Sequence, residues 1–142
     1  MKRTFAALIA LSFTAAPAFA EGDAEAGAKV FNKCKSCHMI VSDAGEEIVK
    51  GGKVGPNLYG VFNRAVGSVE GFRYSSLYEA AGAQGLMITL DNFGAYLADP
   101  SGYIQEATGE SGKGKMQKQR VKDEDVVNLH AYLVSVGPSP ES

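Results

Sequence analysis

Apolar positions recur at helical spacing in a few short segments of this chain, and polar, glycine-rich stretches separate them. The clearest segment spans residues 123–136, with acidic residues in its first turn and Gly137-Pro138 directly after it. Its apolar face comprises Val126, Leu129, Leu133 and Val136. Residues 89–98 carry a second apolar face, and Pro100 closes that segment. The spacing predicts an amphipathic helix in each segment.

Weaker signals predict further helical structure. A helix that Asp23 caps would place Gly27 and Phe31 one turn apart on the same face. Serine can cap a short helix over residues 75–82, and Asp99-Pro100 can start one more helical turn. No segment shows a convincing alternation of apolar and polar residues, so no strand is predicted. The pattern indicates an all-α fold.

The segments between the predicted helices are long for a compact domain. The chain contains 17 glycines and no tryptophan, so its side chains supply only a modest core. Long glycine-rich loops fit a compact protein if they wrap a cofactor instead of packing on one another. We therefore expect one domain, residues 21–142, built around a bound group.

The N-terminus has the features of a secretory signal peptide. Lys2 and Arg3 precede a short apolar run over residues 5–13, and Ala18-Phe19-Ala20 supplies a cleavage site. We predict that residues 1–20 are removed on export to a bacterial periplasm; an uncleaved anchor is the alternative. No later apolar run is long enough to span a bilayer. Loss of the two basic residues takes the net charge from −2 to −4, which argues against a nucleic-acid partner.

The candidate chemistry lies in Cys34-Lys35-Ser36-Cys37-His38. Two thiols three positions apart lie on one side of a helical turn, where they can bond the two vinyl groups on one edge of a porphyrin. His38 projects to the same face and can ligate the iron. The alternatives are a disulfide or redox Cys-x-x-Cys site and a zinc site. Zinc requires four ligands and only His130 remains outside the motif, so one covalent haem c, bound through Cys34 and Cys37, is predicted.

A second axial ligand on the iron would indicate electron transfer, whereas an open face would indicate ligand binding or catalysis. The candidates are Met39, Met87, Met116 and His130. Met39 follows the proximal histidine and cannot reach the far side, and Met87 lies in an apolar run typical of core packing. His130, near the apolar face of the last helix, is more often a packing residue than a ligand. Met116 stands in a polar, basic loop with no core to fill, so its thioether is the favoured ligand.

An ordered series of motifs along nearly the whole mature chain resembles the class I c-type cytochromes, and looks closest to the bacterial cytochrome c2 branch. The series comprises Gly27-x-x-x-Phe31, Cys34-Lys35-Ser36-Cys37-His38, Gly55-Pro56-Asn57-Leu58-Tyr59-Gly60-Val61, Arg64, Gly67, Gly71-Phe72-Arg73-Tyr74-Ser75, Tyr96-Leu97-Ala98-Asp99-Pro100, Lys115-Met116 and Leu129-His130-Ala131-Tyr132-Leu133. Cys-x-x-Cys-His alone indicates only a c-type haem, whereas the ordered series is specific. The resemblance implies the small class I fold, in which N- and C-terminal helices cross and loops wrap one covalent haem.

The resemblance also implies roles for single residues. Met116 becomes the distal iron ligand opposite His38, and the Pro56 carbonyl accepts a hydrogen bond from the His38 ring. The residues implied to line the haem pocket are Leu58 and Tyr96. The residues implied to hydrogen-bond a buried haem propionate are Arg64 and Tyr74.

Three positions depart from the family pattern. Ile88 stands where the family usually has a tryptophan that bonds a propionate, and Lys118 where an aromatic residue shields the haem edge. Tyr78 replaces an asparagine that is usual in the short helix. These departures affect the propionate network, the solvent shielding and the reduction potential, and they leave the attachment site and the iron ligands unchanged.

The predicted function is one-electron transfer by a monomeric carrier that performs no bond chemistry and is therefore not an enzyme. In the resembled family the donor is a cytochrome bc complex, and the acceptor is a photosynthetic reaction centre or a terminal oxidase. The lysines expected to face these membrane complexes are Lys33, Lys35, Lys113, Lys115 and Lys118. They would give an acidic protein a positive face that orients it on acidic partners. The alternatives are an enzyme or gas sensor with an open sixth site and a thiol oxidoreductase without haem.

Overall fold

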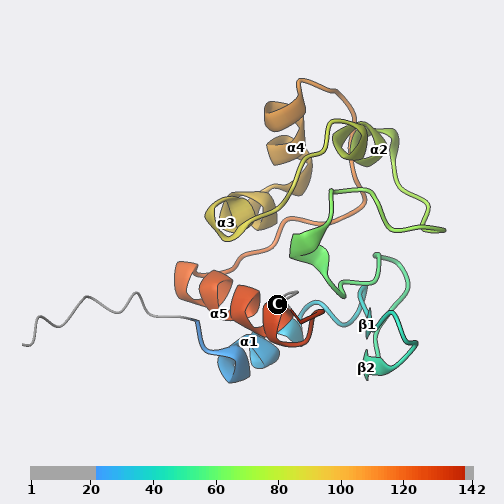
Figure 1. The fold of residues 1–142 in the computed structure, drawn as a ribbon. Helices are drawn as coiled ribbons and strands as arrows, with labels where there is room; N and C mark the ends of the chain where they lie inside the picture. The colour runs from blue at the N-terminus through green and yellow to red at the C-terminus, as the bar shows by residue number, and fades with distance from the viewer. Residues whose placement is uncertain (1–21, 140–142) are drawn as a thin grey trace, which may run out of the picture.

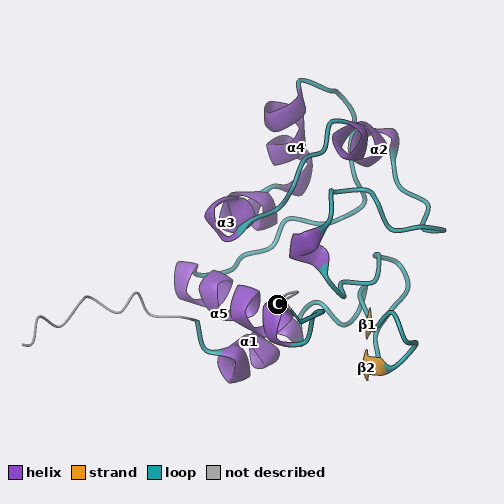
Figure 2. Cartoon of the chain, viewed as in Figure 1, coloured by secondary structure: helices purple, strands orange, loops and turns teal. Residues whose placement is uncertain are grey.

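The computed structural model describes residues 22–139, and the predicted signal peptide lies outside them (Figure 1). Within this range the α-helices are α1 (Ala24–Phe31), α2 (Ser76–Ala83), α3 (Leu90–Ala98), α4 (Pro100–Thr108) and α5 (Asp123–Ser135). The other regular elements are a 3₁₀ turn, η1 (Val61–Asn63), and a small hairpin of β1 (Ile40–Val41) and β2 (Glu47–Val49). The predicted helical fold is confirmed, and long loops connect the elements (Figure 2). In the described part of the chain, no helix has both the length and the apolar character needed to cross a membrane.

The hairpin departs from the prediction of a chain without strands. Its antiparallel pairs, with an irregular register between them, are Ile40 with Val49 and Val41 with Glu47. Strands of two and three residues are too short to show the alternation that identifies a strand in a sequence. The Asn57 side chain acts as a further partner for β1, because it donates to the Val41 carbonyl at 2.7 Å and accepts from the Val41 N–H at 3.0 Å. The hairpin is thereby joined to the loop that follows it.

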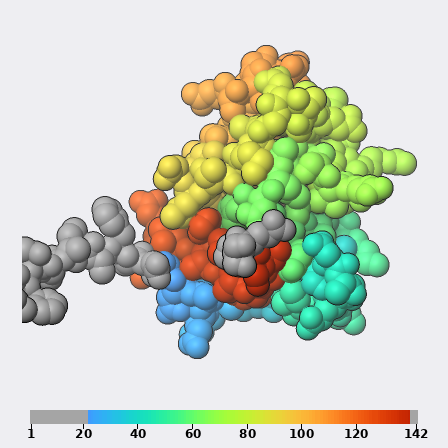
Figure 3. Space-filling model, viewed as in Figure 1, coloured from blue at the N-terminus to red at the C-terminus, as the bar shows by residue number. Residues whose placement is uncertain are grey.

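Helices α1 and α5 cross in close contact at one end of the molecule (Figure 1, Figure 3). A Cβ atom on Gly27 would lie 1.9 Å from the Asn128 carbonyl oxygen and 2.7 Å from the Tyr132 Cβ, so only glycine fits at the crossing. One turn later, the buried Phe31 ring lies 5.5 Å from the Tyr132 ring. The Asn128 side chain accepts a 2.8 Å hydrogen bond from the Asp23 N–H, which joins the start of α1 to α5. The crossing therefore fixes the segment that follows α1.

Residues at the predicted cap positions begin most of the helices. Asp23 caps α1, as predicted, by accepting from two backbone N–H groups. Thr89, predicted as the first residue of a helix, instead precedes α3, and its N–H donates to the Asn92 side chain at 2.8 Å. Asp99 caps α4, and the helical turn predicted there extends through Thr108 as a helix of nine residues. Ser75 occupies the cap position of α2 but makes no capping hydrogen bond. Its hydroxyl is therefore available for another role.

The hydrophobic core joins the inner faces of α1, α3 and α5. Its residues from these helices are Phe31, Phe93, Leu97, Val126, Leu129 and Leu133. The prediction that Met87 packs in the core is wrong, because Met87 is 36% exposed whereas Ile88 is 5% exposed. The chain is extended there and bridges to Ala65, so neighbouring side chains point to opposite sides. Met116, expected to lie away from any core, is half-buried and packs against it.

Candidate functional site

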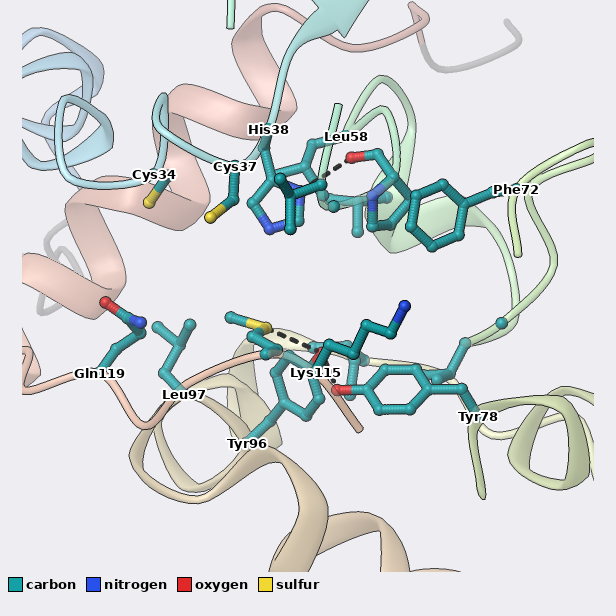
Figure 4. A pocket seen from close by; sticks show the side chains of 18 of the residues that line it. Cys34, Cys37, His38, Leu58, Phe72, Tyr78, Tyr96, Leu97, Lys115 and Gln119 are labelled. Carbon is teal, nitrogen blue, oxygen red and sulfur yellow. Dashed lines mark hydrogen bonds between the residues drawn. The ribbon is translucent and has the colours of Figure 1, made fainter. Parts of the chain in front are cut away.

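The Cys-x-x-Cys-His motif forms a turn that continues from the end of α1. The backbone N–H groups of Cys37 and His38 both donate to the Cys34 carbonyl, at 3.1 and 2.9 Å. The turn places two free, half-buried thiols and the imidazole along one side of a common cavity (Figure 4). Burial raises the pKa of the Cys34 thiol, and the neighbouring Lys33 opposes that rise.

The loop after the hairpin holds the His38 ring in one orientation. A carbonyl oxygen only accepts, so in the 2.8 Å contact the His38 Nδ1–H donates to the Pro56 carbonyl, which leaves Nε2 without a proton in the neutral ring. The side chain is 9% exposed, and burial lowers the imidazole pKa although the bond to Pro56 raises it. The lowered pKa favours the neutral imidazole at neutral pH, which is the form that binds a metal.

Two residues beside Pro56 shape this arrangement, and the sequence gave them no role beyond membership of a motif. A Cβ atom on Gly55 would lie 2.3 Å from His38 Cε1, so glycine lets the backbone approach the ring. The Asn57 side chain, already bonded to β1, also accepts from the Tyr59 N–H at 3.1 Å. The available signal was Gly-Pro-Asn, a typical turn sequence, but its partners could not be read from it.

Two tyrosines lie on the opposite side of the cavity from His38 (Figure 4). The Tyr96 hydroxyl donates to the Met116 sulfur at 3.3 Å, which places Met116 on that side as well. The hydroxyl oxygens of Tyr78 and Tyr96 are 3.0 Å apart. Burial raises the pKa of both phenols, that of Tyr96 well above its ordinary value, so both stay protonated. An imidazole thus bounds the cavity on one side and a thioether on the other.

The loop that carries Met116 is attached to α4 before it reaches that residue. The Gln105 side chain donates to the Gly112 carbonyl at 2.6 Å. The Gly114 N–H donates to the Ser101 hydroxyl at 2.9 Å. These two bonds come from a helix that the sequence predicted only as a turn, so they were not foreseen.

The same loop is attached again just after Met116. The Gln119 N–H donates to the Leu97 carbonyl at 2.8 Å, at the end of α3. Lys118 forms an ion pair with Asp99 at 2.8 Å. Lys118 was expected to be a surface lysine free to meet a partner, but part of its charge is balanced within the chain.

The cavity between the two walls has a volume of about 320 Å³. The apolar residues that line it include Leu58, Phe93, Leu97, Leu129 and Leu133. Two thiols stand at one edge, with a nitrogen and a thioether donor on opposite faces. A flat apolar macrocycle with vinyl groups and an iron matches this donor set, so the residues fit a covalent haem.

Polar side chains line the cavity between η1 and α2. The Arg64 guanidinium donates to two carbonyl groups of the preceding loop, and burial lowers its pKa. The Tyr74 hydroxyl accepts from the Val69 N–H at 3.2 Å, which leaves its own proton available. The Ser75 Oγ is buried without a hydrogen-bond partner. A haem carboxylate would satisfy this orphaned donor, a role missed because the sequence suggested only a helix cap.

The remaining candidates take other positions. His130 packs against Phe62 with ring centroids 4.4 Å apart and the ring planes tilted by 44°, which agrees with its predicted packing role, and burial lowers its pKa. Ile88 is buried and lines the cavity. Lys33 and Lys115 also line the cavity, on opposite walls next to Cys34 and Met116.

Comparisons with known proteins agree with this geometry. Residues 24–137 match the cytochrome c family. The chain is 54% identical over 141 residues to cytochrome c-551 from Roseobacter denitrificans, covering 98% of this chain and 99% of that one. It is 44% identical over 145 residues to cytochrome c2 from Cereibacter sphaeroides, covering 99% and 100%.

Solved structures show the same likeness. The X-ray structure of cytochrome c2 from Rhodobacter sphaeroides matches with a TM-score of 0.78 at 44% identity, covering 84% of this chain and 100% of that one. Ferric cytochrome c-550 from Paracoccus versutus matches with a TM-score of 0.73 at 40% identity, covering 83% and 100%.

Proposed function

The chain belongs to the cytochrome c family, in its cytochrome c2 branch, and from this premise we propose that it carries single electrons between membrane complexes of a bacterial periplasm. As a member of that branch it is an electron carrier with one haem c, attached through Cys34 and Cys37. The proposal adds the two iron ligands, His38 and Met116, the cellular location and the partners.

The observation that carries the proposal is the pairing of His38 and Met116 across the cavity. The Pro56 bond directs His38 Nε2 inward from one side, and the Tyr96 bond holds the Met116 sulfur on the other. Haem c supplies one iron that alternates between its ferric and ferrous states. If His38 and Met116 both bound the iron, no ligand position would remain for a substrate or a gas, and the methionine would raise the reduction potential. The proposed role is therefore electron transfer and not catalysis.

Further residues are proposed to seat the group. Leu58 and Tyr96 contact its faces, since both line the cavity. Arg64, Tyr74 and Ser75 bind a haem carboxylate, and the unpartnered Ser75 hydroxyl is the strongest support for a polar group at that place. A buried hydroxyl without a partner costs about 1–3 kcal/mol, which such a bond would remove.

The proposed docking face is formed by exposed lysines around the cavity, toward a cytochrome bc complex and a reaction centre or oxidase. Its residues are Lys33 and Lys115, which line the cavity, and Lys35, Lys113 and Lys118, which are exposed and lie within three positions of them in the sequence. Positive charge around the haem site attracts acidic partners and raises the rate of productive encounter. Lys118 contributes less than the others because it is paired with Asp99.

Replacement of the distal ligand tests the proposal. Met116→Ala should keep the covalent haem, since the thiols lie on the opposite wall, but should open one axial position. Carbon monoxide should then bind the reduced variant readily, and bind both the native protein and the exposed-site control Met87→Ala poorly. Equal binding to native protein and Met116→Ala, measured by absorbance, would show that Met116 is not a ligand.

A further inference from the structure

Tyr78 in α2 contributes a hydroxyl to the cavity wall at a position where the family usually has an asparagine. We propose that Tyr78 is a positioning residue for the Met116 sulfur and acts through Tyr96. Its hydroxyl donates to the Tyr96 oxygen and thereby directs the Tyr96 proton to the sulfur. The inference rests on the proposed ligation of iron by Met116.

The direction of both hydrogen bonds follows from the number of protons available. A thioether carries no proton, so in the 3.3 Å contact Tyr96 must donate to Met116. A phenol has one proton, so Tyr96 has none left for Tyr78, and in the 3.0 Å contact Tyr78 must donate. If Tyr78 did not donate, the Tyr96 proton could turn toward the Tyr78 oxygen, and the sulfur would lose its partner.

The Tyr78 ring is held so that its hydroxyl stays beside Tyr96. The residue is 9% exposed, and the Tyr74 ring lies nearly parallel to it at 10°, with centroids 6.2 Å apart. A Cβ atom on Gly114 would lie 2.2 Å from the Tyr78 Cε2, so this ring rests against the backbone two residues before Met116. Among the described residues, the one hydrogen-bond partner of the Tyr78 hydroxyl is Tyr96.

Through these contacts Tyr78 affects the electron density on the Met116 sulfur, although it does not touch that atom. A hydrogen bond to the Met116 sulfur draws electron density away from the sulfur, which favours ferrous over ferric iron. Donation from Tyr78 polarises the Tyr96 hydroxyl and strengthens its bond to the sulfur. Tyr78 therefore raises the reduction potential of the protein.

The test is redox titration of haem-containing variants, each of which lacks the hydroxyl oxygen of one tyrosine. Tyr78→Phe keeps the ring against Gly114 and should shift the reduction potential downward, with up to about a fivefold change in the oxidised-to-reduced ratio at fixed solution potential. Tyr103→Phe is the matched control. Its ring packs edge-on against Tyr96 at 6.2 Å, but within residues 22–139 its hydroxyl makes no hydrogen bond. This control should leave the potential unchanged.

A double-mutant cycle separates positioning from a general structural effect. Tyr96→Phe removes the donor to the sulfur, so adding Tyr78→Phe to it should cause no further shift. An equal shift in both backgrounds, or a Tyr78→Phe potential equal to that of Tyr103→Phe, would overturn the inference. If Met116→Ala binds carbon monoxide readily while Tyr78→Phe leaves the potential unchanged, only the Tyr78 inference fails and the ligation stands.

A further test uses the native protein alone and therefore does not depend on whether a variant folds. In proton NMR of the reduced form, the Tyr96 hydroxyl proton should show proximity to the Met116 side chain, and the Tyr78 hydroxyl proton to the Tyr96 ring. A Tyr96 proton close to Tyr78 and distant from Met116 would contradict the proposed direction.

Discussion

On the His38 side of the haem cavity, the attachment turn extends from two packed helices, whereas the Met116 side is a loop held by separate hydrogen bonds. On the first side, the attachment motif continues from α1, and α1 meets α5 with backbone against backbone at Gly27. On the second side, bonds from α4 hold the loop before Met116, and bonds from Leu97 in α3 and from Asp99 hold it after Met116. The position of His38 thus depends on the packing of the whole fold, and that of Met116 on a few local contacts.

The two sides should therefore fail in different ways. Damage at the helix crossing should lower the stability of the entire domain, because the core lies directly behind it. Damage in the loop should release Met116 while the core stays folded, since local segments open at lower free energy than the whole molecule.

The largest effect on stability is expected from Gly27→Val, which disrupts the crossing of α1 and α5 behind His38. Its Cβ would meet the Asn128 carbonyl at 1.9 Å, and backbone cannot rotate away as a side chain can. We expect a loss of about 3 kcal/mol, at the upper end of the range for overpacking. Denaturant unfolding of the haem-containing protein measures it. Gly94→Ala is the control, since a Cβ there would lie 3.8 Å from Val126 and a helix favours alanine. An unchanged midpoint for Gly27→Val would refute the close crossing.

Gly114→Ala should displace the Met116 loop and should lower the stability less than Gly27→Val does. Its Cβ would lie 2.2 Å from the buried Tyr78 ring, so the loop has to shift two residues before Met116. We expect carbon monoxide to bind a larger fraction of the reduced variant than of native protein. Ser111→Ala, an exposed change in the same loop, should behave as native. Low carbon monoxide binding with a large loss of stability would show that both sides respond alike.

Charge reversal should affect the encounter with a partner and spare both sides of the cavity. Replacement of Lys113 and Lys115 by glutamate should lower the association rate with a membrane redox complex by about tenfold or more at low salt. The native rate should fall as salt rises, since charges are screened beyond about 10 Å at 0.1 M. Glutamate at Lys29 and Lys122, which belong neither to the proposed docking face nor to the cavity lining, changes the net charge equally and should have less effect. Stopped-flow kinetics across a salt series measures both. A flat salt dependence in the native protein would refute electrostatic steering.

The smallest effect is expected from Asp99→Asn, which removes one charge that holds the Met116 loop. The hydrogen bond from Lys118, and then that from the Gly102 N–H, lower the Asp99 pKa. A lowered folded pKa stabilises the protein above the ordinary carboxyl pKa of about 4, and that stabilisation is lost as pH falls through the folded pKa. The denaturant midpoints of native protein and variant should thus differ slightly at pH 7 and converge in acid. A difference that stays constant with pH would show that the ion pair is not its cause.

Much of the His38 side could be predicted because its signals are local. The Asp23 cap, the pairing of Gly27 with Phe31 and the attachment turn each involve residues within about four positions of one another. The helix bounds were close for the same reason. The hairpin was missed because its strands are too short to show a pattern.

The Met116 side was less predictable because its contacts join distant parts of the chain. Composition indicated a loop without core contact, yet Met116 packs against the core. Met87 was assigned to the core from its apolar neighbours, but the extended backbone turns it outward. Nothing in the sequence pairs Lys118 with Asp99.

The sequence by itself determined the covalent attachment site, the family and the order of the helices, because these depend on contiguous residues and on spacing within a turn. The tertiary structure alone decided which polar groups meet around His38 and Met116. Tyr78 lies 18 positions from Tyr96, and Tyr96 lies 20 positions from Met116, so their hydrogen bonds exist only because α2, α3 and the loop pack together. The packing of these elements also decides that the Ser75 hydroxyl is buried without a hydrogen-bond partner. Distances between remote residues follow from how helices and loops pack, and one sequence contains no direct measure of that packing.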